Sequence, residues 1–550
     1  MRLNETLYSN LDMKITKDKI LYSPTDLNHF VACKYHIKND LLADEKKLKK
    51  KKISSNLQLR IKYGHEHEAK HFELFKKKYN QNITINRKLT DEQRFEATKQ
   101  ALIKGYEFIY NAFFIEKDFR GEFDFLIKTD TKSDLGDYSY EVYDTKISKN
   151  LKSKDVLQIT GYSYLLSKVQ GLLPKHMYLI NGNSKFKKYK VNEFINYFTY
   201  TKNRFEKLLP ELKKSDIYPE KCSYCQFCPW LDICEKTWED DNYINQVARI
   251  NRSQVIKLKK ENIGTVEALA KISALKIKSK INQASKIRLV QQAKLQEEKR
   301  LTGKSRYIFN DTEEGKGFYK MPKENEGDLF YDIEGFPQSE KRNYEYLHGI
   351  YYLNSKNNEY KSFVVKEYTE NEEERIFIDL VNFLKKHFDK YPEAFIYHYN
   401  DYEKRALKDL SNEYSSFFPE GANLVDKLLR QKKFIDLYRV VEQCMQTTEK
   451  DISLKTIEKF YPAERNADVK TADDSIRLFE DWSATNDPKL MKDIINYNEE
   501  DCISTYKLRN FLLNEKPSTI PDFSQSDEEI EANSDTKDFE KKEIEFIKKL

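Results

Sequence analysis

Acidic residues and one lysine recur in the N-terminal half at spacings that suit metal-dependent hydrolysis. The segment RGEFDFLI (120–127) alternates like a strand and carries Asp124, and SYEVYDTKI (139–147) is a second strand-like run with Asp144 and Lys146. Residues two apart share one face of a strand, so Asp144 and Lys146 point to the same side. Carboxylates hold Mg²⁺ or Mn²⁺, and an ammonium group stabilises charge that develops on a phosphate. These segments therefore predict a catalytic strand.

Two helical segments flank these strands. GHEHEAKHFELF (64–75) places His67 near the start of an amphipathic helix, and DVLQITGYSYLL (155–166) places Gln158 and Tyr162 one helical turn apart. Each piece alone is weak, because an Asp-Thr-Lys triplet also occurs as an exposed ion pair and a helical histidine is more often structural than a ligand. The order of the motifs is more informative than any one of them.

A second set of acids lies in the C-terminal half. Asp332 and Glu334 are two apart in a strand-like run, so both carboxylates project from one face. Glu403 follows a later strand, and Tyr497 and Asp501 are four apart on a helix, so that the phenol and the carboxylate share a face. The alternative interpretation, surface acids on amphipathic helices, leaves the strand pair unexplained.

Four of the seven cysteines crowd into KCSYCQFCPWLDICEK with the spacing C-x2-C-x2-C-x5-C. In a reducing compartment such crowding indicates a metal site before disulfides. Zinc held by these four local thiolates is one interpretation. Cys444 and Cys502 lie in helical contexts far from this cluster and are expected to be ordinary buried thiols.

The length of 550 residues predicts two or three domains. Apolar residues at 39% and aromatic residues at 13% exclude a wholly disordered chain. The net charge is only +6, so a nucleic-acid surface must arise from local clustering. No run approaches the roughly 20 apolar residues of a membrane span, and the first residues lack the apolar centre of a secretory signal. A cytoplasmic protein without a membrane partner is therefore expected.

Secondary-structure patterns divide the chain into four parts. Residues 1–240 mix helix and strand patterns and end at the cysteine cluster, and residues 241–322 have the spacing of an all-helical connector. Strand-like runs alternate with helices again in residues 323–515, which predicts a second α/β domain. Residues 516–550 are acidic and are predicted to form a disordered tail with one short terminal helix.

The motif order G-x-x-H-E, G-E-F-D, D-x-K, Q-x-x-x-Y and C-x2-C-x5-C resembles the RecB-like branch of the PD-(D/E)XK nucleases, which includes the CRISPR-associated iron-sulfur exonucleases. The resemblance covers nearly all of residues 20–240 and implies a restriction-endonuclease-like fold. One departure is that the proline that commonly precedes this aspartate in that branch is absent before Asp124. It implies the following roles: His67, Asp124 and Asp144 as metal ligands with Glu68 beside them, Lys146 as the catalytic lysine, and Gln158 and Tyr162 as the helix motif near the DNA.

The same resemblance bears on the cysteines. In that branch one distant N-terminal cysteine joins a C-x2-C-x5-C segment and so links the two ends of the domain. This implies a [4Fe-4S] cluster, held by Cys33, Cys225, Cys228 and Cys234. Cys222 is then spare, but it could instead complete a local Zn²⁺ site with the other three clustered cysteines and without Cys33, so both assignments stay open.

The strand D-x-E, a middle acid and the helix Y-x3-D together resemble the DEDDy exonucleases of the RNase H-like fold. The resemblance implies two metal ions, held by Asp332, Glu334, Glu403 and Asp501, with Tyr497 orienting the attacking water and with digestion from 3′ ends. The middle motif departs from the usual pattern, because an aromatic-Asp pair is replaced by Tyr402-Glu403.

The pairing of both domains resembles a family of RecB-like nucleases with a fused RNase H-like domain, over about residues 20–513. Longer relatives continue into a superfamily 1 helicase. This chain has no G-x4-G-K-[ST] phosphate loop, so a separate helicase is the expected source of the substrate strand. We expect a metal-dependent nuclease that acts on DNA single strands or ends at two sites. A nucleic-acid-binding scaffold with inactive sites and an RNA-directed exonuclease stay open, because no motif reads the 2′-hydroxyl.

Overall fold

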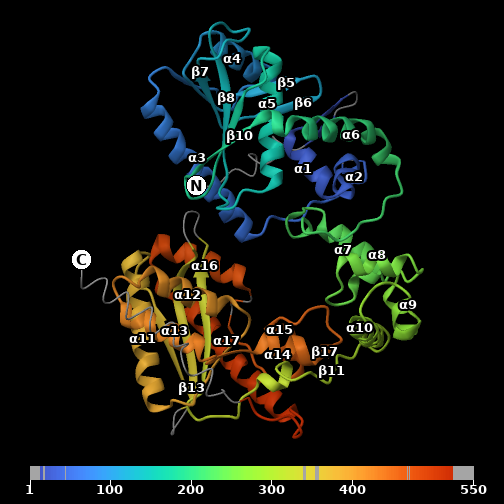
Figure 1. Cartoon of the computed structure of the whole chain (residues 1–550), viewed down its shortest axis with the longest axis vertical. Coiled ribbons are helices and arrows are strands. Elements are labelled where there is room, and N and C mark those ends of the chain that lie inside the picture. The colour runs from blue at the N-terminus through green and yellow to red at the C-terminus, as the bar shows by residue number, and fades with distance from the viewer. Residues whose placement is uncertain are drawn as a thin grey trace, which may run out of the picture. The chain divides into compact units, whose positions relative to one another are not determined.

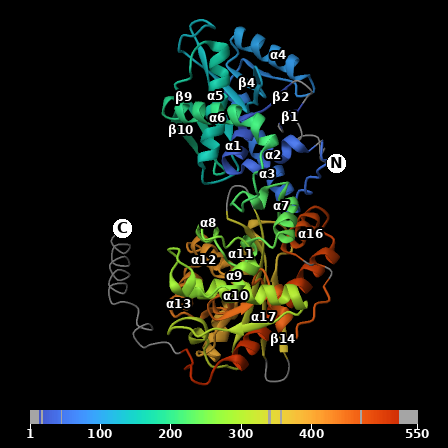
Figure 2. The same cartoon turned by 90° about the vertical axis from the view of Figure 1, so that its right-hand side faces the viewer.

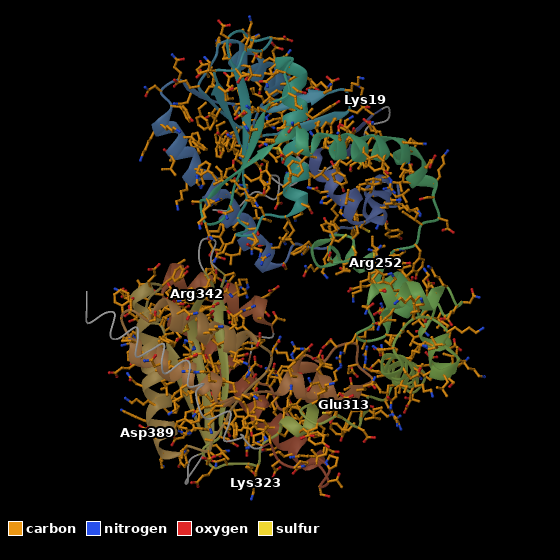
Figure 3. The ribbon with its side chains drawn as sticks, viewed as in Figure 1. Lys19, Arg252, Glu313, Lys323, Arg342 and Asp389 are labelled. Carbon is orange, nitrogen blue, oxygen red and sulfur yellow. The ribbon has the colours of Figure 1, made fainter. Side chains whose placement is uncertain are left out.

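The computed structural model describes residues 13–15, 19–43, 45–337, 342–353, 358–467, 469 and 471–523, with only the backbone at 55 and 56. The predicted tail helix lies outside these residues. The chain divides after Asp240 into two units, and each is described by itself. Charged side chains such as Lys19, Arg252 and Asp389 are exposed on the surfaces of the units (Figure 3). In the described part of the chain, no helix is both long enough and apolar enough to cross a membrane.

The first unit is built on a six-stranded mixed sheet with the strand order β10-β9-β8-β7-β4-β3. Its strands are β3 (Asn82–Thr84), β4 (Phe108–Tyr110), β7 (Phe125–Thr129), β8 (Ser139–Thr145), β9 (His176–Ile180) and β10 (Phe186–Lys190). Strand β8 pairs antiparallel with β7 and parallel with β9. Helix α3 (Ser55–Lys78) and helix α5 (Ser153–Gln170) lie on either side of this sheet (Figure 1).

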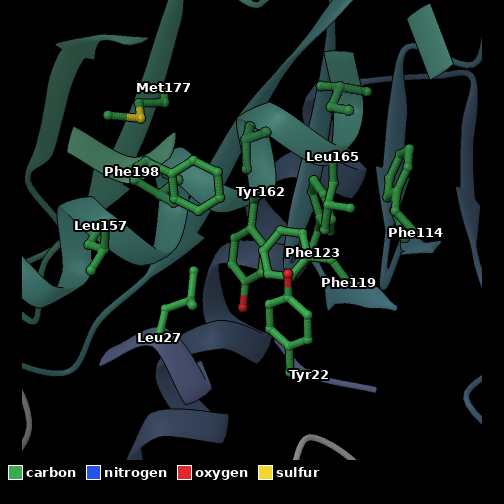
Figure 4. Packing of buried hydrophobic residues seen from close by; sticks show 14 of the residues in the cluster. Tyr22, Leu27, Phe114, Phe119, Phe123, Leu157, Tyr162, Leu165, Met177 and Phe198 are labelled. Carbon is green, nitrogen blue, oxygen red and sulfur yellow. The ribbon is translucent and has the colours of Figure 1, made fainter. Parts of the chain in front are cut away.

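The alternating side chains of β8 explain this layering. Val142 faces the larger core, which includes α5, whereas Tyr143 on the opposite face packs against Phe75 of α3 with ring centroids 6.0 Å apart. Figure 4 shows the larger core around Tyr162, whose ring lies 4.7 Å from that of Phe123. Both faces of β8 are thus covered by helices, and its C-terminal end is left to carry polar groups.

The remaining elements of the first unit surround this core. Helices α1, α2 and α6 lie together beside α5 (Figure 2). Their bounds, with those of the other elements, are β1 (Lys14–Ile15), β2 (Ile20–Leu21), α1 (Pro24–Ala32), α2 (Lys34–Leu42), α4 (Asp91–Ile103), β5 (Phe113–Glu116), β6 (Phe119–Glu122), α6 (Ile195–Lys214) and α7 (Leu231–Asp240). The segment 120–127, expected as one strand, is divided between β6 and β7, because β6 leaves the main sheet to pair with β5.

The second unit contains a five-stranded sheet with the order β14-β13-β12-β15-β16. Its strands are β12 (Leu329–Phe336), β13 (Tyr344–Leu353), β14 (Asn358–Val364), β15 (Ile396–His398) and β16 (Phe434–Asp436). Helix α17 (Pro488–Glu515) packs Tyr506 on Phe330 of one face, and helix α11 (Glu370–Lys390) packs Phe383 on Phe363 of the other. The other α-helices that follow β12 in the chain are α12 (Tyr402–Glu413), α13 (Pro419–Arg430), α14 (Leu437–Cys444), α15 (Leu454–Ile457) and α16 (Ala472–Thr485).

The segment between the two sheets belongs to the second unit. Its helices are α8 (Arg252–Lys259), α9 (Val266–Lys271) and α10 (Gln283–Thr302). The expectation that it is entirely helical is wrong at β11 (Tyr307–Phe309), which pairs with β17 (Met445–Thr447). Because its partner strand is more than 130 residues away, local periodicity could not predict β11. Glu449, just after β17, anchors the end of α10 through Lys299.

One fully buried ion pair connects the two elements that carry the acids of the second unit. Arg509 of α17 donates from Nη1 to Asp328 Oδ2 at 2.6 Å, and both side chains have no exposed surface. Asp328 immediately precedes β12, and its other carboxylate oxygen accepts the backbone N–H of Phe395 at 3.1 Å. The pair therefore fixes the start of β12 against α17.

Candidate functional site

The first candidate site lies at the C-terminal end of β8. Asp124, in the short gap between β6 and β7, accepts hydrogen bonds from the backbone N–H of Thr145 at 2.7 Å and from its hydroxyl at 2.6 Å. Asp144 is the penultimate residue of β8, and Lys146 follows the strand and forms an ion pair with Asp144. The structure thus brings together the Asp124, Asp144 and Lys146 side chains that the sequence singled out.

These acids are held where negative charge is unfavourable. Burial, Asp144 and the nearby Glu68 raise the pKa of Asp124 well above its usual value. Burial also raises the pKa of Asp144, although the Lys146 ammonium opposes this. Carboxylates with raised pKa values, close together and facing one cation, are the kind of cluster that a divalent cation stabilises.

Helix α3 contributes His67 and Glu68, which are both buried. Glu68 accepts a hydrogen bond from the Tyr110 hydroxyl at 2.8 Å and forms an ion pair with Arg87 at 3.4 Å. Although burial opposes ionisation, contacts with His65, Arg87 and Tyr110 lower the pKa of Glu68, so it stays an anion beside the two aspartates. The motif analysis assigned Glu68 only a secondary role beside His67, and no local pattern indicated its partner Tyr110.

The side chains of Gln158 and Tyr162 form a hydrogen bond with each other. Gln158 Nε2 donates to the Tyr162 hydroxyl at 2.9 Å, and the Tyr162 ring is buried against Phe123 (Figure 4). Burial, Asp144 and Asp124 raise the pKa of Tyr162 well above its usual value, which places the phenol within the field of the acidic site.

The second candidate site joins β12 to α17. Asp332, Glu334 and Asp501 each offer a carboxylate oxygen, and these oxygens all lie within 4.8 Å of one another. Within the described ranges, no other group of three histidine, cysteine or acidic side chains is so tight. Burial, Asp501 and Glu334 raise the pKa of Asp332 well above its usual value, and burial raises that of Glu334 to about 8, with Asp501 adding to it.

Neighbouring polar side chains orient each of the three acids. Asn498 donates to Asp332 at 2.7 Å, Ser475 donates to Glu334 at 2.8 Å, and Arg465 donates to Asp501 at 2.6 Å. Sequence reasoning missed all three of these partners. Asn498 follows Tyr497 directly, so the helix motif pointed to its neighbourhood, but Ser475 and Arg465 come from elements that have no motif of their own.

Glu403 and Tyr497 lie beside the trio of acids. The Glu403 carboxylate is 3.4 Å from His398 Nδ1 and does not belong to the tight group, although its charge contributes to the raised pKa of Asp332. The Tyr497 hydroxyl accepts a hydrogen bond from Lys455 at 3.1 Å, and Asp501 and Glu334 add to the effect of burial in raising its pKa. The structure therefore places the predicted fourth acid near the site but against a histidine.

Five cysteines of the first unit line one small cavity: Cys33, Cys222, Cys225, Cys228 and Cys234. Cys33 lies at the junction of α1 and α2, so the fold brings the distant cysteine to the local cluster. His36 was not anticipated; its Nδ1 lies 3.3 Å from Cys228 Sγ, and its Nε2 lies 3.1 Å from Asp40. Burial opposes the charged imidazole, but these two contacts raise the pKa of His36 to about 9.

Five thiols around one cavity fit a thiophilic metal, either iron in a cluster or zinc. The donor set contains one sulfur more than either centre needs. A protonated His36 would donate to Cys228 and so favour that thiolate. Cys444 and Cys502 are buried in the second unit, as expected for structural thiols.

Comparison with known families agrees with this geometry. Residues 42–235 match the PD-(D/E)XK nuclease superfamily, and residues 329–513 match the RNase_H superfamily. No curated protein sequence is significantly similar to the chain. The chain therefore contains a PD-(D/E)XK nuclease domain followed by an RNase H-like domain. The predicted fold class and the fused two-domain family are confirmed, and the protein is an enzyme of the nuclease type.

Proposed function

We propose that the protein hydrolyses phosphodiester bonds of DNA, on single strands or at ends, with one site in each nuclease domain. The observation that carries this proposal is the trio Asp332, Glu334 and Asp501, whose carboxylate oxygens lie within 4.8 Å of one another, with Glu334 buried and the two aspartates half-buried. Three acids this close, which are at least half-buried, repel one another, and a pair of divalent cations is the partner that such a site suits. The acidic cluster therefore supports use of Mg²⁺ or Mn²⁺.

The side chains of the second site have separable roles in this proposal. When bound, the metal ions would supply an activated water and stabilise the leaving oxygen. Asn498 and Ser475 hold the carboxylates of Asp332 and Glu334 in one orientation. Tyr497, positioned by Lys455, is assigned the orientation of the attacking water. Glu403 is assigned as the fourth acid of the 3′-to-5′ exonuclease site. In this role its carboxylate would have to move from its position 3.4 Å from His398 Nδ1 toward the other three acids.

In the first site, Asp124 and Asp144 are assigned as metal ligands together with His67 of α3. Lys146 is assigned the stabilisation of charge on the phosphate, which is supported by its ion pair with Asp144 beside the buried acids. The Gln158–Tyr162 pair is assigned to the positioning of this site, because Tyr162 lies in the field of both aspartates.

The test uses end-labelled single-stranded DNA, duplex DNA and RNA with Mg²⁺ or Mn²⁺. Asp332→Asn with Glu334→Gln should abolish stepwise digestion from 3′ ends, whereas Asp144→Asn should abolish the activity of the first site and leave the second. Asp389→Asn is the matched control, because it removes an exposed acid of the second unit. If the variant that combines all three site changes digests every substrate as the wild type does, neither site is a nuclease. Preferential digestion of RNA would favour the RNA-directed alternative.

We further propose a [4Fe-4S] cluster at Cys33, Cys225, Cys228 and Cys234, supported by the convergence of Cys33 on the clustered thiols. Anaerobically purified protein should then absorb broadly near roughly 400 nm, and Cys33→Ser should lose this absorption. A colourless protein with one zinc, which survives Cys33→Ser and is lost in Cys222→Ser, would establish the local zinc site instead.

A further inference from the structure

Strand β10 forms an outer edge of the first sheet and is made of basic and aromatic residues. Its sequence is FKKYK, preceded by Lys185, and the side chains of Lys185, Lys187 and Lys188 are exposed. Lysines on an edge strand commonly serve to prevent pairing with another sheet. That explanation does not account for Phe186, which is 52% exposed on the same edge, because an exposed ring increases the risk of association.

The strand register connects this edge to the first candidate site. Lys187 pairs with Leu179 of β9, and Leu179 pairs with Asp144 of β8. Paired residues project from the same face, so Lys187 lies on the Asp144 face, two strand spacings or about 9.6 Å away. Successive nucleotides of an extended strand are roughly 6–7 Å apart, which is twice the per-strand rise of a stacked duplex. The distance from Lys187 to Asp144 therefore corresponds to about one and a half nucleotides.

The opposite face of the sheet carries rings on β8, β9 and the edge strand β10, where Phe186 also packs against Phe75 of α3 with ring centroids 6.2 Å apart. Tyr143 and Tyr178 stack with centroids 4.1 Å apart and an interplanar angle of 4°. Lys188 pairs with Tyr178 across the strands, and its ammonium lies 5.8 Å from that ring. Phe186 lies on this face too, two residues from Lys188, with its ring 6.5 Å from Tyr143. Phosphate-binding lysines interleaved with rings are the pattern of proteins that bind single-stranded nucleic acid.

We propose that β10 and Lys185 bind a single strand of nucleic acid that enters the Asp144–Lys146 site. The three lysines contact its phosphates, and Phe186 stacks on an unpaired base. The single strand is favoured over a duplex because a duplex does not expose the faces of its bases. This inference rests on the nuclease function proposed for the first site and adds its substrate-binding edge.

The experiment measures binding of labelled (dT)20 by fluorescence anisotropy with EDTA present, over a series of salt concentrations. In the variant with Lys185→Gln, Lys187→Gln and Lys188→Gln, the slope of log K against log salt should fall by about 2, at about 0.7 for each lost phosphate contact. The matched control changes Lys104, Lys132 and Lys168 to glutamine, which are three exposed lysines outside β10 and its neighbour β9, and should keep the wild-type slope.

Phe186→Ala provides an independent measurement. It should weaken binding of (dT)20 about 5- to 140-fold through lost stacking and leave the salt slope unchanged. Melting temperatures of all variants identify any that fail to fold, and single lysine substitutions then replace the triple. An unchanged slope in the folded lysine variants would overturn the inference, as would tighter binding of a duplex than of (dT)20.

The same proteins separate this inference from the nuclease proposal. If the wild type binds (dT)20 through these lysines but digests nothing in Mg²⁺ or Mn²⁺, the binding edge stands and the proposed activity fails. If an Asp144-dependent nuclease activity is present and the lysine variant binds as the wild type does, the activity stands and the binding edge fails.

Discussion

Arg509→Met offers a sharp test of how the second site is held together. In the wild type, the Arg509 guanidinium pairs with Asp328 in a fully buried position and packs on the rings of Phe330 and Tyr397, with centroids 4.9 and 5.2 Å away. Methionine keeps most of the apolar contact but removes the charge. The Asp328 carboxylate is then buried without its cation, at the point where β12 meets α17.

The expected cost follows from this burial. Removal of one partner of a buried ion pair destabilises a protein by about 3–5 kcal/mol, because the other charge is left unpaired. For a unit of roughly this size each kcal/mol lowers the melting temperature by about 2–4 °C, so the drop should be about 6–20 °C. Asp328→Asn in the same chain should restore part of the loss, because it removes the unpaired anion. The recovery is incomplete because both Asp328 oxygens accept backbone N–H groups, from Asn325 and Phe395, and an asparagine amide can accept only one of them.

The pH dependence has a definite sign. Burial raises the pKa of Asp328 and Arg509 opposes this, so loss of Arg509 raises that pKa further. A carboxyl whose pKa is raised by folding binds a proton more readily in the folded protein, so its penalty is small at low pH and grows as pH rises through the raised pKa.

Calorimetry at pH 5 and pH 8 measures these effects, with Asp389→Asn as the exposed control. The deficit of Arg509→Met should be larger at pH 8 than at pH 5. A loss under about 1 kcal/mol, or a double variant that is less stable than Arg509→Met alone, would refute the reasoning, because the cost would not then come from an unpaired buried charge.

Three further outcomes are expected. Gly349→Ala should destabilise the second unit and slow the digestion of 3′ ends that we propose for it, because the added Cβ would lie 1.7 Å from Asn498 Oδ1. Normal activity in end-labelled assays would show that Asn498 is not needed. Glu449→Gln should lower the melting temperature at pH 7 but not near pH 2. Burial opposes the Glu449 anion, but surrounding lysines and a serine lower its pKa to about 2. The stabilisation by this carboxylate is therefore complete above about pH 4.5 and is lost as the pH falls toward 2. A deficit that is constant with pH would contradict this. Trp230→Phe removes a 2.9 Å hydrogen bond to Asp40 and should speed the loss to a chelator of the metal that we propose for the cysteine cluster. An unchanged rate of metal loss would show that this hydrogen bond does not stabilise the centre.

Local spacing by itself determined the pairs that share an element. Asp332 and Glu334 face one way because strand side chains alternate, and Tyr497 and Asp501 do so because four residues make about one helical turn. These relations depend only on backbone geometry, so they could be predicted before any fold was known. The α/β class followed in the same way from the periodicity of short runs.

Tertiary structure alone decided which partners meet across long stretches of chain. Ser475 reaches Glu334 from 141 residues away, and Asn498 reaches Asp332 from 166 residues away. The break in segment 120–127 likewise depends on the pairing of β6 with β5. Such contacts arise because burial of apolar faces brings distant elements together, and no local pattern records which elements will meet.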